Sequence, residues 1–196
     1  MFKVLTEGCK PTKATKYSAA VDVYASHDVT IGAGETKLVG LGIAINLDNL
    51  LENVPMVKDM RRWHKERFKA GIIDVSEEDS LIPIKDEFLK SNYIQLMLND
   101  SLATKGLILN SGIKIFNLDF ADELKMIIHN PLFWSDHIVH SNEIGVSVIQ
   151  QKVCKDCNFI IKKGDKIGQL ILLEHKSYLM DIKSNNERNG GFSSTD

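Results

Sequence analysis

The segment Leu107–Asn130, LILNSGIKIFNLDFADELKMIIHN, contains the pattern that decides the fold. It opens with an apolar run, turns at residues 110–112, and gathers carboxylates and an amide between Asn117 and Glu123. A run with alternating apolar residues, 124–128, leads out of this polar cluster and predicts a β-strand. Polar side chains on a turn between two apolar strands are well placed to hold a small charged ligand.

Similar short apolar runs recur along the chain and are separated by turns that contain glycine. Many of their residues are β-branched, as is typical of strands. Short strands at this spacing predict an all-β protein, an antiparallel sandwich or barrel. The runs lie at residues 2–5, 18–25, 36–47, 93–98 and 166–173.

Residues 47–70 interrupt this pattern, because their apolar residues follow helical spacing. Pro55 is expected to split or bend this helix, and a second short helix is predicted near residues 85–90. The first helix is rich in Lys and Arg, and this basic face could bind a phosphate or a partner. Basic helix faces are, however, commonly only solvated.

Composition excludes several classes of protein. A chain of 196 residues with 43% hydrophobic content can bury one core, so a single domain is expected. The net charge of -2 gives no positive field for nucleic acid. Residues 1–4 start a strand-like run and not a charged-then-apolar leader, and no run approaches 18 apolar residues, so we expect neither a secretory signal nor a membrane span. The three cysteines of the chain therefore indicate a reducing compartment. We expect a cytoplasmic protein that binds neither membranes nor nucleic acid.

Five short segments occur in an order that is informative. They are SAAVDVYA at 18–25, SLATKG at 101–106, NLDFADE at 117–123, GDKIGQL at 164–170 and GGFSST at 190–195. In that order they resemble the five motifs of the trimeric dUTP diphosphatase (dUTPase) family. Each segment alone is weak evidence, but the order makes the resemblance specific.

The resemblance covers about half of a single domain, residues 1–196. Two segments lie outside it and are expected to be insertions, a helical one at about 48–92 and a second at 131–159. The spacing favours dUTPases over the related dCTP deaminases. Glu123 stands seven residues before Asn130, as in dUTPases, whereas the deaminase pattern places a carboxylate where Ile127 stands.

The resemblance implies an all-β, jelly-roll-like or β-barrel subunit with an inserted helical segment, assembled as a homotrimer. It also implies Mg²⁺-assisted hydrolysis of dUTP to dUMP and pyrophosphate. A carboxylate would activate water for attack on the α-phosphorus, while metal and hydrogen-bond donors hold the triphosphate. A β-hairpin would read the uracil edge, and an aromatic residue would close over the base.

The same resemblance assigns roles to individual residues. Asp22 matches the carboxylate that holds Mg²⁺ through water, and Asn117 and Asp119 lie where the catalytic carboxylate belongs. Gln169 matches an amide near the phosphates, and Phe192 matches the aromatic residue that closes the site. The other residues expected to contact substrate are Ser101, Phe120, Arg188, Ser193 and Ser194.

Several family residues are replaced where chemistry is expected. Asn117 stands in place of the water-activating Asp, and an amide cannot accept that proton at neutral pH. Phe120 stands in place of a Tyr. Asn99 and Asp100 stand in place of an Arg-Ser pair, which exchanges a phosphate-binding cation for a carboxylate that repels phosphate. One of the insertion's arginines, Arg61 or Arg62, could replace the lost cation in a neighbouring subunit.

Three functions remain open at this point. The first is a working dUTPase whose base is Asp119, Asp100 or Glu123. The second is a catalytically impaired protein of the same fold that binds or sequesters another nucleotide. The third is a regulatory trimer that uses the fold to bind a protein.

A separate pattern lies in the second insertion. His137 and His140 are followed by Cys154 and Cys157, and two imidazoles with two thiolates suit tetrahedral Zn²⁺. A structural zinc could stabilise a short hairpin without a core of its own. The spacing between the histidines is tighter than usual, and the alternative is a set of unrelated histidines and reduced thiols.

Overall fold

The computed structural model of the protein describes most of the chain. The described residues are 1–72, 76–131, 135–140, 147–152 and 157–180.

The largest sheet is antiparallel and has four strands in the order β2-β13-β6-β8. Along β6 the side chains alternate, so that Ile94 and Leu96 are fully buried while Tyr93 and Gln95 are half-buried on the other face. This alternation places one face of the sheet on the hydrophobic core. The strands are β2 (Val21–Tyr24), β6 (Asn92–Leu98), β8 (Lys114–Asn117) and β13 (Lys166–Glu174).

A second sheet, of three strands in the order β4-β9-β7, packs across the same core. Met126 and Ile128 of β9 are fully buried there. The described residues also form three two-stranded sheets, β1-β5, β3-β12 and β10-β11, and this mostly β architecture confirms the all-β prediction. The remaining strands are β1 (Phe2–Val4), β3 (Val29–Ile31), β4 (Thr36–Gly40), β5 (Ile43–Ile45), β7 (Ile108–Leu109), β9 (Lys125–His129), β10 (Ser135–His140), β11 (Ser147–Lys152) and β12 (Phe159–Ile161).

The polar segment 118–124 connects the two larger sheets. The strand before it, β8, pairs with β6, whereas the strand after it, β9, pairs with β4 and β7. Leu124 joins the segment to the body of the fold, because its N–H donates to Ile43 O at 2.8 Å and its carbonyl accepts from Leu41 N at 2.9 Å. The two strands that flank the polar cluster therefore lie in different sheets.

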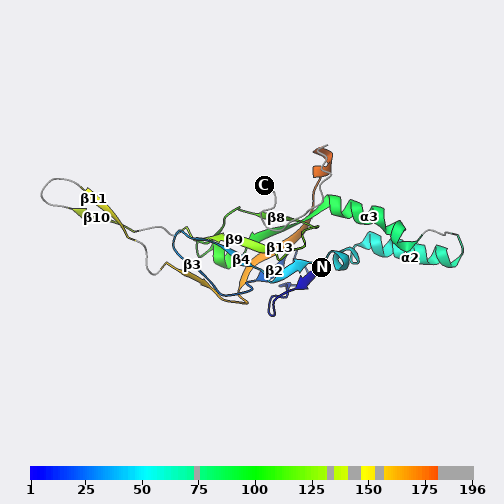
Figure 1. The fold of residues 1–196 in the computed structure, drawn as a ribbon, viewed down its shortest axis with the longest axis horizontal. Coiled ribbons are helices and arrows are strands. Elements are labelled where there is room, and N and C mark those ends of the chain that lie inside the picture. The colour runs from blue at the N-terminus through cyan, green and yellow to red at the C-terminus, as the bar shows by residue number, and fades with distance from the viewer. Residues whose placement is uncertain (73–75, 132–134, 141–146, 153–156, 181–196) are drawn as a thin grey trace.

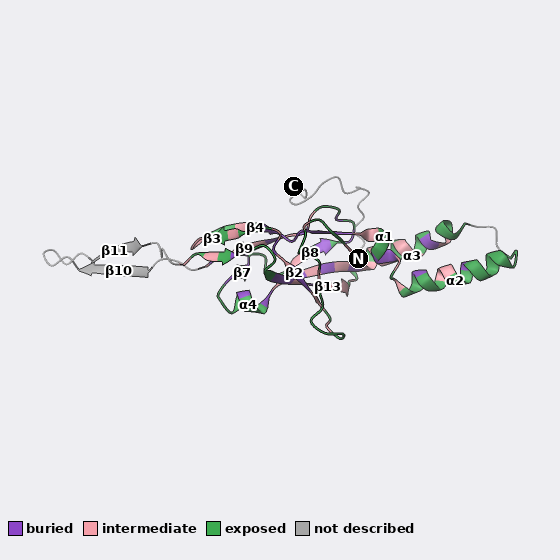
Figure 2. Cartoon of the chain, turned by 90° about the horizontal axis from the view of Figure 1, so that it is seen from below, coloured by how far each residue is buried: buried purple, intermediate pink, exposed green. Residues whose placement is uncertain are grey.

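The inserted helices α1 (Leu47–Leu51), α2 (Pro55–Lys69) and α3 (Glu77–Ser91) lie at one end of the β-structure, and β10 and β11 lie at the other (Figures 1 and 2). As predicted, the first helix is split at Pro55, which begins α2. The second helix is longer than predicted. Ser76 caps its N-terminus by accepting from Asp79 N at 3.1 Å, and three acidic residues favour its first turn.

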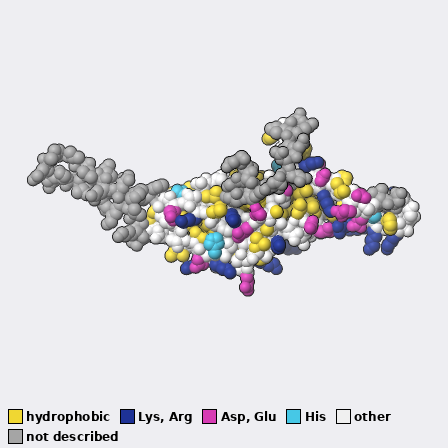
Figure 3. All heavy atoms as spheres, in the orientation of Figure 1, with side chains coloured by type: hydrophobic (Ala, Val, Ile, Leu, Met, Phe, Trp, Pro, Cys, Tyr) yellow, Lys and Arg dark blue, Asp and Glu magenta, His cyan; other side chains and the backbone are white. Residues whose placement is uncertain are grey.

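The helices α2 and α3 carry charged side chains of both signs (Figure 3). Arg61 forms ion pairs with two glutamates. Its Nη2 lies 2.6 Å from Glu52 Oε1, and its Nε lies 3.3 Å from Glu77 Oε1, so its guanidinium is engaged by the insertion itself. Arg62 is exposed, and its Nη1 lies 3.7 Å from Asp59 Oδ1.

Two further short helices in the described residues are α4 (Asp100–Ala103) and the 3-10 helix Ser177–Met180. No helix in the described part of the chain is long and apolar enough to cross a membrane.

Candidate functional site

Asp22 on β2 is the centre of a group of polar residues that we call the Asp22 cluster. Its Oδ1 accepts a hydrogen bond from Gln169 Nε2 at 3.0 Å, and its Oδ2 lies 2.9 Å from Lys166 Nζ. Only 4% of Asp22 is exposed. The structure thus brings together Asp22 and Gln169, which belong to two separate sequence motifs.

The geometry of β13 explains how Lys166 joins this cluster. Residues 166 and 169 would point to opposite faces of a regular strand. The register shifts between Lys166 and Gly168, and such a bulge changes which face the following side chains take. Gly168 is required there, because a Cβ at this position would lie 2.9 Å from the carbonyl oxygen of Met97 on the neighbouring strand.

These contacts also set the charge state of Asp22. The hydrogen bond from Gln169 and, after it, the contacts with Lys166 lower the pKa of the Asp22 carboxyl, while burial acts in the opposite direction. In return, Asp22 raises the pKa of the Lys166 ammonium. The cluster therefore keeps its carboxylate ionised.

The resemblance also matches Asp22 to the carboxylate that holds Mg²⁺ through water, and the neighbours of Asp22 limit how its carboxylate could bind this ion. Each carboxylate oxygen already accepts one hydrogen bond and keeps one further lone pair. Within the described ranges, no group of three His, Cys, Asp or Glu side chains could hold a metal ion. Asp22 therefore fits a water-mediated contact with Mg²⁺ that has other ligands, and it does not fit a complete metal site.

Asn99 stands where the resemblance expects an arginine, and here it caps a helix. Its Oδ1 accepts from Ser101 N at 3.0 Å and from Ser101 Oγ at 2.6 Å, which fixes the start of α4. Its backbone N–H donates to Ile167 O at 3.0 Å. This bond holds the second motif beside β13, at the same end of the sheet as the Asp22 cluster.

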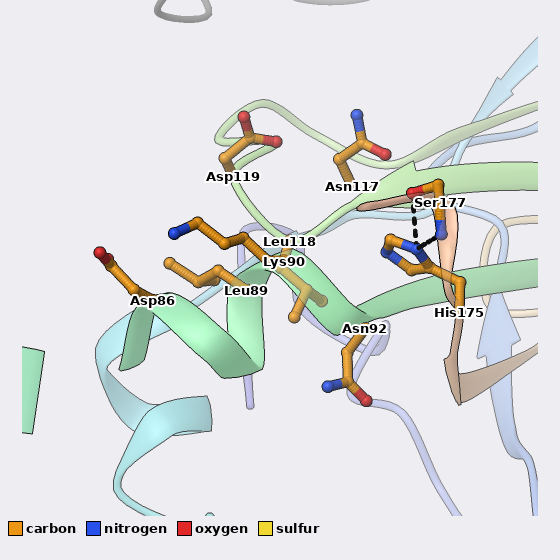
Figure 4. A pocket seen from close by; sticks show the side chains of 9 residues that line it. All are labelled: Asp86, Leu89, Lys90, Asn92, Asn117, Leu118, Asp119, His175 and Ser177. Carbon is orange, nitrogen blue, oxygen red and sulfur yellow. Dashed lines mark hydrogen bonds between the residues drawn. The ribbon is translucent and has the colours of Figure 1, made fainter. Parts of the chain in front are cut away.

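Asn117 and Asp119 line a pocket of about 550 Å³, which we call the Asn117 pocket (Figure 4). Asn117 ends β8, and Asp119 follows it on the polar segment. The C-terminal turns of α3 form another part of the wall, and the segment after β13 completes it. The other lining residues are Asp86, Leu89, Lys90, Asn92, Leu118, His175 and Ser177.

Two other residues of the polar segment, Phe120 and Glu123, have structural contacts. Phe120, expected to contact substrate, is only 3% exposed and packs on Phe116 with ring centroids 5.5 Å apart. Its ring is therefore not available to a ligand in this conformation. Glu123 Oε1 accepts from Gly42 N at 2.8 Å, and Asp100 lies in the first turn of α4. Asp119 is thus the one of the three alternative bases that lines the pocket with Asn117.

The Asp22 cluster and the Asn117 pocket lie apart within one chain. Gln169 pairs with Met97 of β6, whereas Asn117 pairs with Tyr93, four residues away along the same strand. Four residues of strand span about 13 Å. Asp22 lies on β2 and Asn117 lies on β8, and these are the two outer strands of the four-stranded sheet.

Other predicted residues lie outside the described part of the chain. These include Arg188, Phe192, Ser193 and Ser194.

Of the zinc candidates, His137 and His140 lie on β10, and Cys154 is outside the described residues. Cys157 is disulfide-bonded, unlike the free Cys9, and a disulfide sulfur is not a thiolate ligand. The zinc hypothesis gains no support.

Sequence reasoning missed Lys90 and His175 as pocket residues. Lys90 belongs to the insertion, and His175 follows β13 outside the motifs. No spacing signal links these positions with Asn117, because chain folding alone brings the three segments together.

The comparisons with known proteins identify the fold. No protein-family profile matches the chain, and no curated protein sequence matches it. The dUTPase from phage phi11 of S. aureus aligns with a TM-score of 0.54 and 13% identity, covering 99% of this chain and 97% of that one. The dUTPase of Staphylococcus bacteriophage 80alpha with dUpNHpp aligns with a TM-score of 0.53 and 13% identity, covering 99% and 89%.

A third structure, a mutant of the phi11 enzyme described as revealing the coordination of a structural Mg(II) ion, has a TM-score of 0.52 and 13% identity, covering 99% of this chain and 98% of that one. The protein therefore has the dUTPase fold, as the five ordered motifs predicted.

Proposed function

We propose that the protein is a dUTPase-like nucleotide-binding protein that hydrolyses dUTP to dUMP and pyrophosphate with Mg²⁺. The observation that carries this proposal is the pocket shared by Asn117 and Asp119 on a dUTPase fold. The Asp22 cluster provides the second half of the site. The retained pair Asp22 and Gln169, already hydrogen-bonded, supports nucleotide binding.

The active unit is a homotrimer. Because the Asp22 cluster and the Asn117 pocket lie at different ends of one sheet, a single nucleotide cannot contact both within one chain. A neighbouring subunit can place its own Asp22 cluster against the pocket. In this assembly the deoxynucleoside binds in the Asn117 pocket of one subunit, and the triphosphate extends towards the Asp22 cluster of the next.

Asp119 is the base of the proposed reaction. It accepts a proton from water, whose oxygen forms a bond with the α-phosphorus. The bond from the α-phosphorus to the bridging oxygen breaks, and its electron pair leaves with pyrophosphate. Asn117 orients the sugar or the water by hydrogen bonding, since its amide cannot take the proton. Mg²⁺, bound with the triphosphate, would neutralise phosphate charge, and Asp22 would hold a water of that ion.

The experiment measures pyrophosphate release from dUTP, dCTP, dTTP and dATP with Mg²⁺, by wild type, Asp119→Asn and Asn117→Asp. We expect wild-type turnover selective for dUTP, and a loss of at least about 100-fold in kcat for Asp119→Asn, as is typical when a general base is removed. Glu123→Gln would probe another carboxylate on the same segment that does not line the pocket. Equal rates for wild type and Asp119→Asn would contradict the role of Asp119.

A second candidate function is supported by Asn117 itself. A protein that lost its base could keep the pocket and bind nucleotide without hydrolysis. In that case wild type and Asp119→Asn would both release no pyrophosphate, dUTP would still raise the melting temperature of the wild type, and Asn117→Asp would gain activity. No turnover and no thermal shift with any nucleotide would contradict both functions.

A further inference from the structure

Lys90 is the one lysine or arginine among the described residues that line the Asn117 pocket (Figure 4). It belongs to the last turn of α3, inside the helical insertion and outside the five sequence motifs. The proposed function gives it no part in the reaction. A cation from the insertion thus stands in the pocket without an assigned role.

The fold places the last turn of α3 beside the end of β8. The helix ends at Ser91, and β6 begins at the next residue and pairs Tyr93 with Asn117. The carbonyl oxygen of Ser91 accepts a hydrogen bond at 2.7 Å from the backbone N–H of His175, which follows β13. Lys90 therefore lies next to a helix end that is bound to two strands of the sheet.

Packing holds this turn against the body of the fold. Phe88 and Leu89 are half-buried and pack on the hydrophobic core. Asn92 is only 9% exposed, and its Nδ2 donates to the carbonyl oxygen of Phe88 at 2.9 Å. The position of the Lys90 backbone at the pocket is thus set by buried contacts on both sides of it.

The ammonium of Lys90 is exposed, and within the described ranges it forms no ion pair and no hydrogen bond. Asp86 stands one helical turn earlier, and in Figure 4 the ammonium is seen between the carboxylates of Asp86 and Asp119. Two other cations of the insertion are engaged, since Arg61 binds two glutamates and Lys85 pairs with a third. The charge of Lys90 is therefore available to a ligand.

The proposed reaction sets which part of the nucleotide lies in front of Asp119. A general base lies about 2.6–3.2 Å from the oxygen whose proton it takes, and a water poised for attack lies about 3–3.5 Å from the reacting atom. The α-phosphorus then lies within about 7 Å of the Asp119 carboxylate. This places the α-phosphate at the pocket that Lys90 also lines.

Resting on the proposed function, we propose that Lys90 is a catalytic residue whose ammonium contacts a non-bridging oxygen of the α-phosphate and stabilises the transition state. As water loses its proton to Asp119, its oxygen brings negative charge towards an anionic phosphate, and a cation beside both offsets the repulsion. Lys90 keeps its own proton throughout. The water oxygen bonds to the α-phosphorus, and pyrophosphate leaves with the electron pair of the broken bond.

The test measures two quantities for the full chain with Mg²⁺, namely pyrophosphate release from dUTP and binding of the non-hydrolysable dUpNHpp by calorimetry. Lys90→Met keeps much of the aliphatic side chain but has no charge, and we expect its kcat to fall at least about tenfold. Its affinity for dUpNHpp should change by no more than about threefold, because the contact strengthens in the transition state. Lys90→Arg keeps the charge and should retain most of the activity.

Lys85 offers a matched control, because it is a lysine of the same helix that pairs with Glu78 and lines neither the Asn117 pocket nor the adjoining one. Lys85→Met should match wild type in both measurements. Thermal unfolding without ligand confirms that each variant is folded, and Lys90→Gln replaces Lys90→Met if the latter is not.

A wild-type kcat in folded Lys90→Met would overturn this inference, whereas dUTP turnover by wild type would still support the proposed function. An equal loss of kcat in Lys85→Met would also overturn it, because the loss would then reflect the overall charge of the helix. If wild type releases no pyrophosphate from dUTP, the proposed hydrolysis and this inference fail together.

Discussion

The Asp22 cluster and the Asn117 pocket lie at opposite ends of one sheet, and they differ in how their polar atoms are satisfied. Asp22 is buried, and both its carboxylate oxygens are bound by side chains of the protein. Asn117 is exposed at the end of β8 and faces an open pocket. The first group is therefore part of the folded structure, whereas the second is available to a ligand. The two should respond differently to substitution.

The largest effect on stability is expected for Asp22→Ala. It removes a buried carboxylate and leaves the partly buried Gln169 amide without its partner, and we expect the free energy of unfolding to fall by about 2 kcal/mol. Denaturant unfolding measures this loss. Asp28→Ala is the matched control, because Asp28 also binds a lysine, Lys162 at 3.3 Å, but on an exposed surface. An equal loss for both variants would show that burial of Asp22 is not important.

The pH dependence of the free energy of unfolding tests whether the ionised carboxylate of Asp22 stabilises the fold. Because the folded pKa of Asp22 is lowered, its ionised form stabilises the fold. This contribution is fully present above the unfolded pKa of about 3.9, and it is lost as the pH falls through the folded value. Asp22→Asn should therefore lose less stability than wild type between pH 5 and 2, each being compared with its own value at pH 7. Parallel curves would contradict this role.

An intermediate effect is expected for Asn99→Ala, which removes the cap of α4. The loss of both bonds to Ser101 should lower the free energy of unfolding by about 1 kcal/mol. Asn99→Asp, which can still accept both bonds, should stay close to wild type. If the two variants unfold at the same denaturant concentration, Asn99 has no capping role.

The smallest effect is expected for Asn117→Ala. The side chain is exposed and the pocket is open, so the free energy of unfolding should change by no more than about 0.5 kcal/mol. Nucleotide binding, measured by calorimetry with dUpNHpp, should nevertheless weaken. A large loss of stability would mean that the pocket, like the Asp22 cluster, is held together by its own polar contacts.

Sequence patterns predicted the strands well where local signals agree. The alternation of buried and half-buried residues along β6 is a local property, and so is the break before Pro55. The sequence pattern predicts a shorter α3, because the acidic residues 77–79 resemble a loop, whereas the cap at Ser76 makes them the first helical turn. The motif position predicts a substrate contact for Phe120, but it does not reveal that the ring is buried against Phe116.

By itself, the sequence determined the class of fold, the order of the motifs, and the replacement of the expected catalytic Asp by Asn117. These follow from residue types and their spacing along the chain. Only the tertiary structure decided that a bulge in β13 turns Lys166 towards Asp22, and that α3 and His175 form a pocket with Asn117. The physical reason is that register shifts and the packing of distant segments depend on contacts between residues far apart in the chain, which local patterns do not encode.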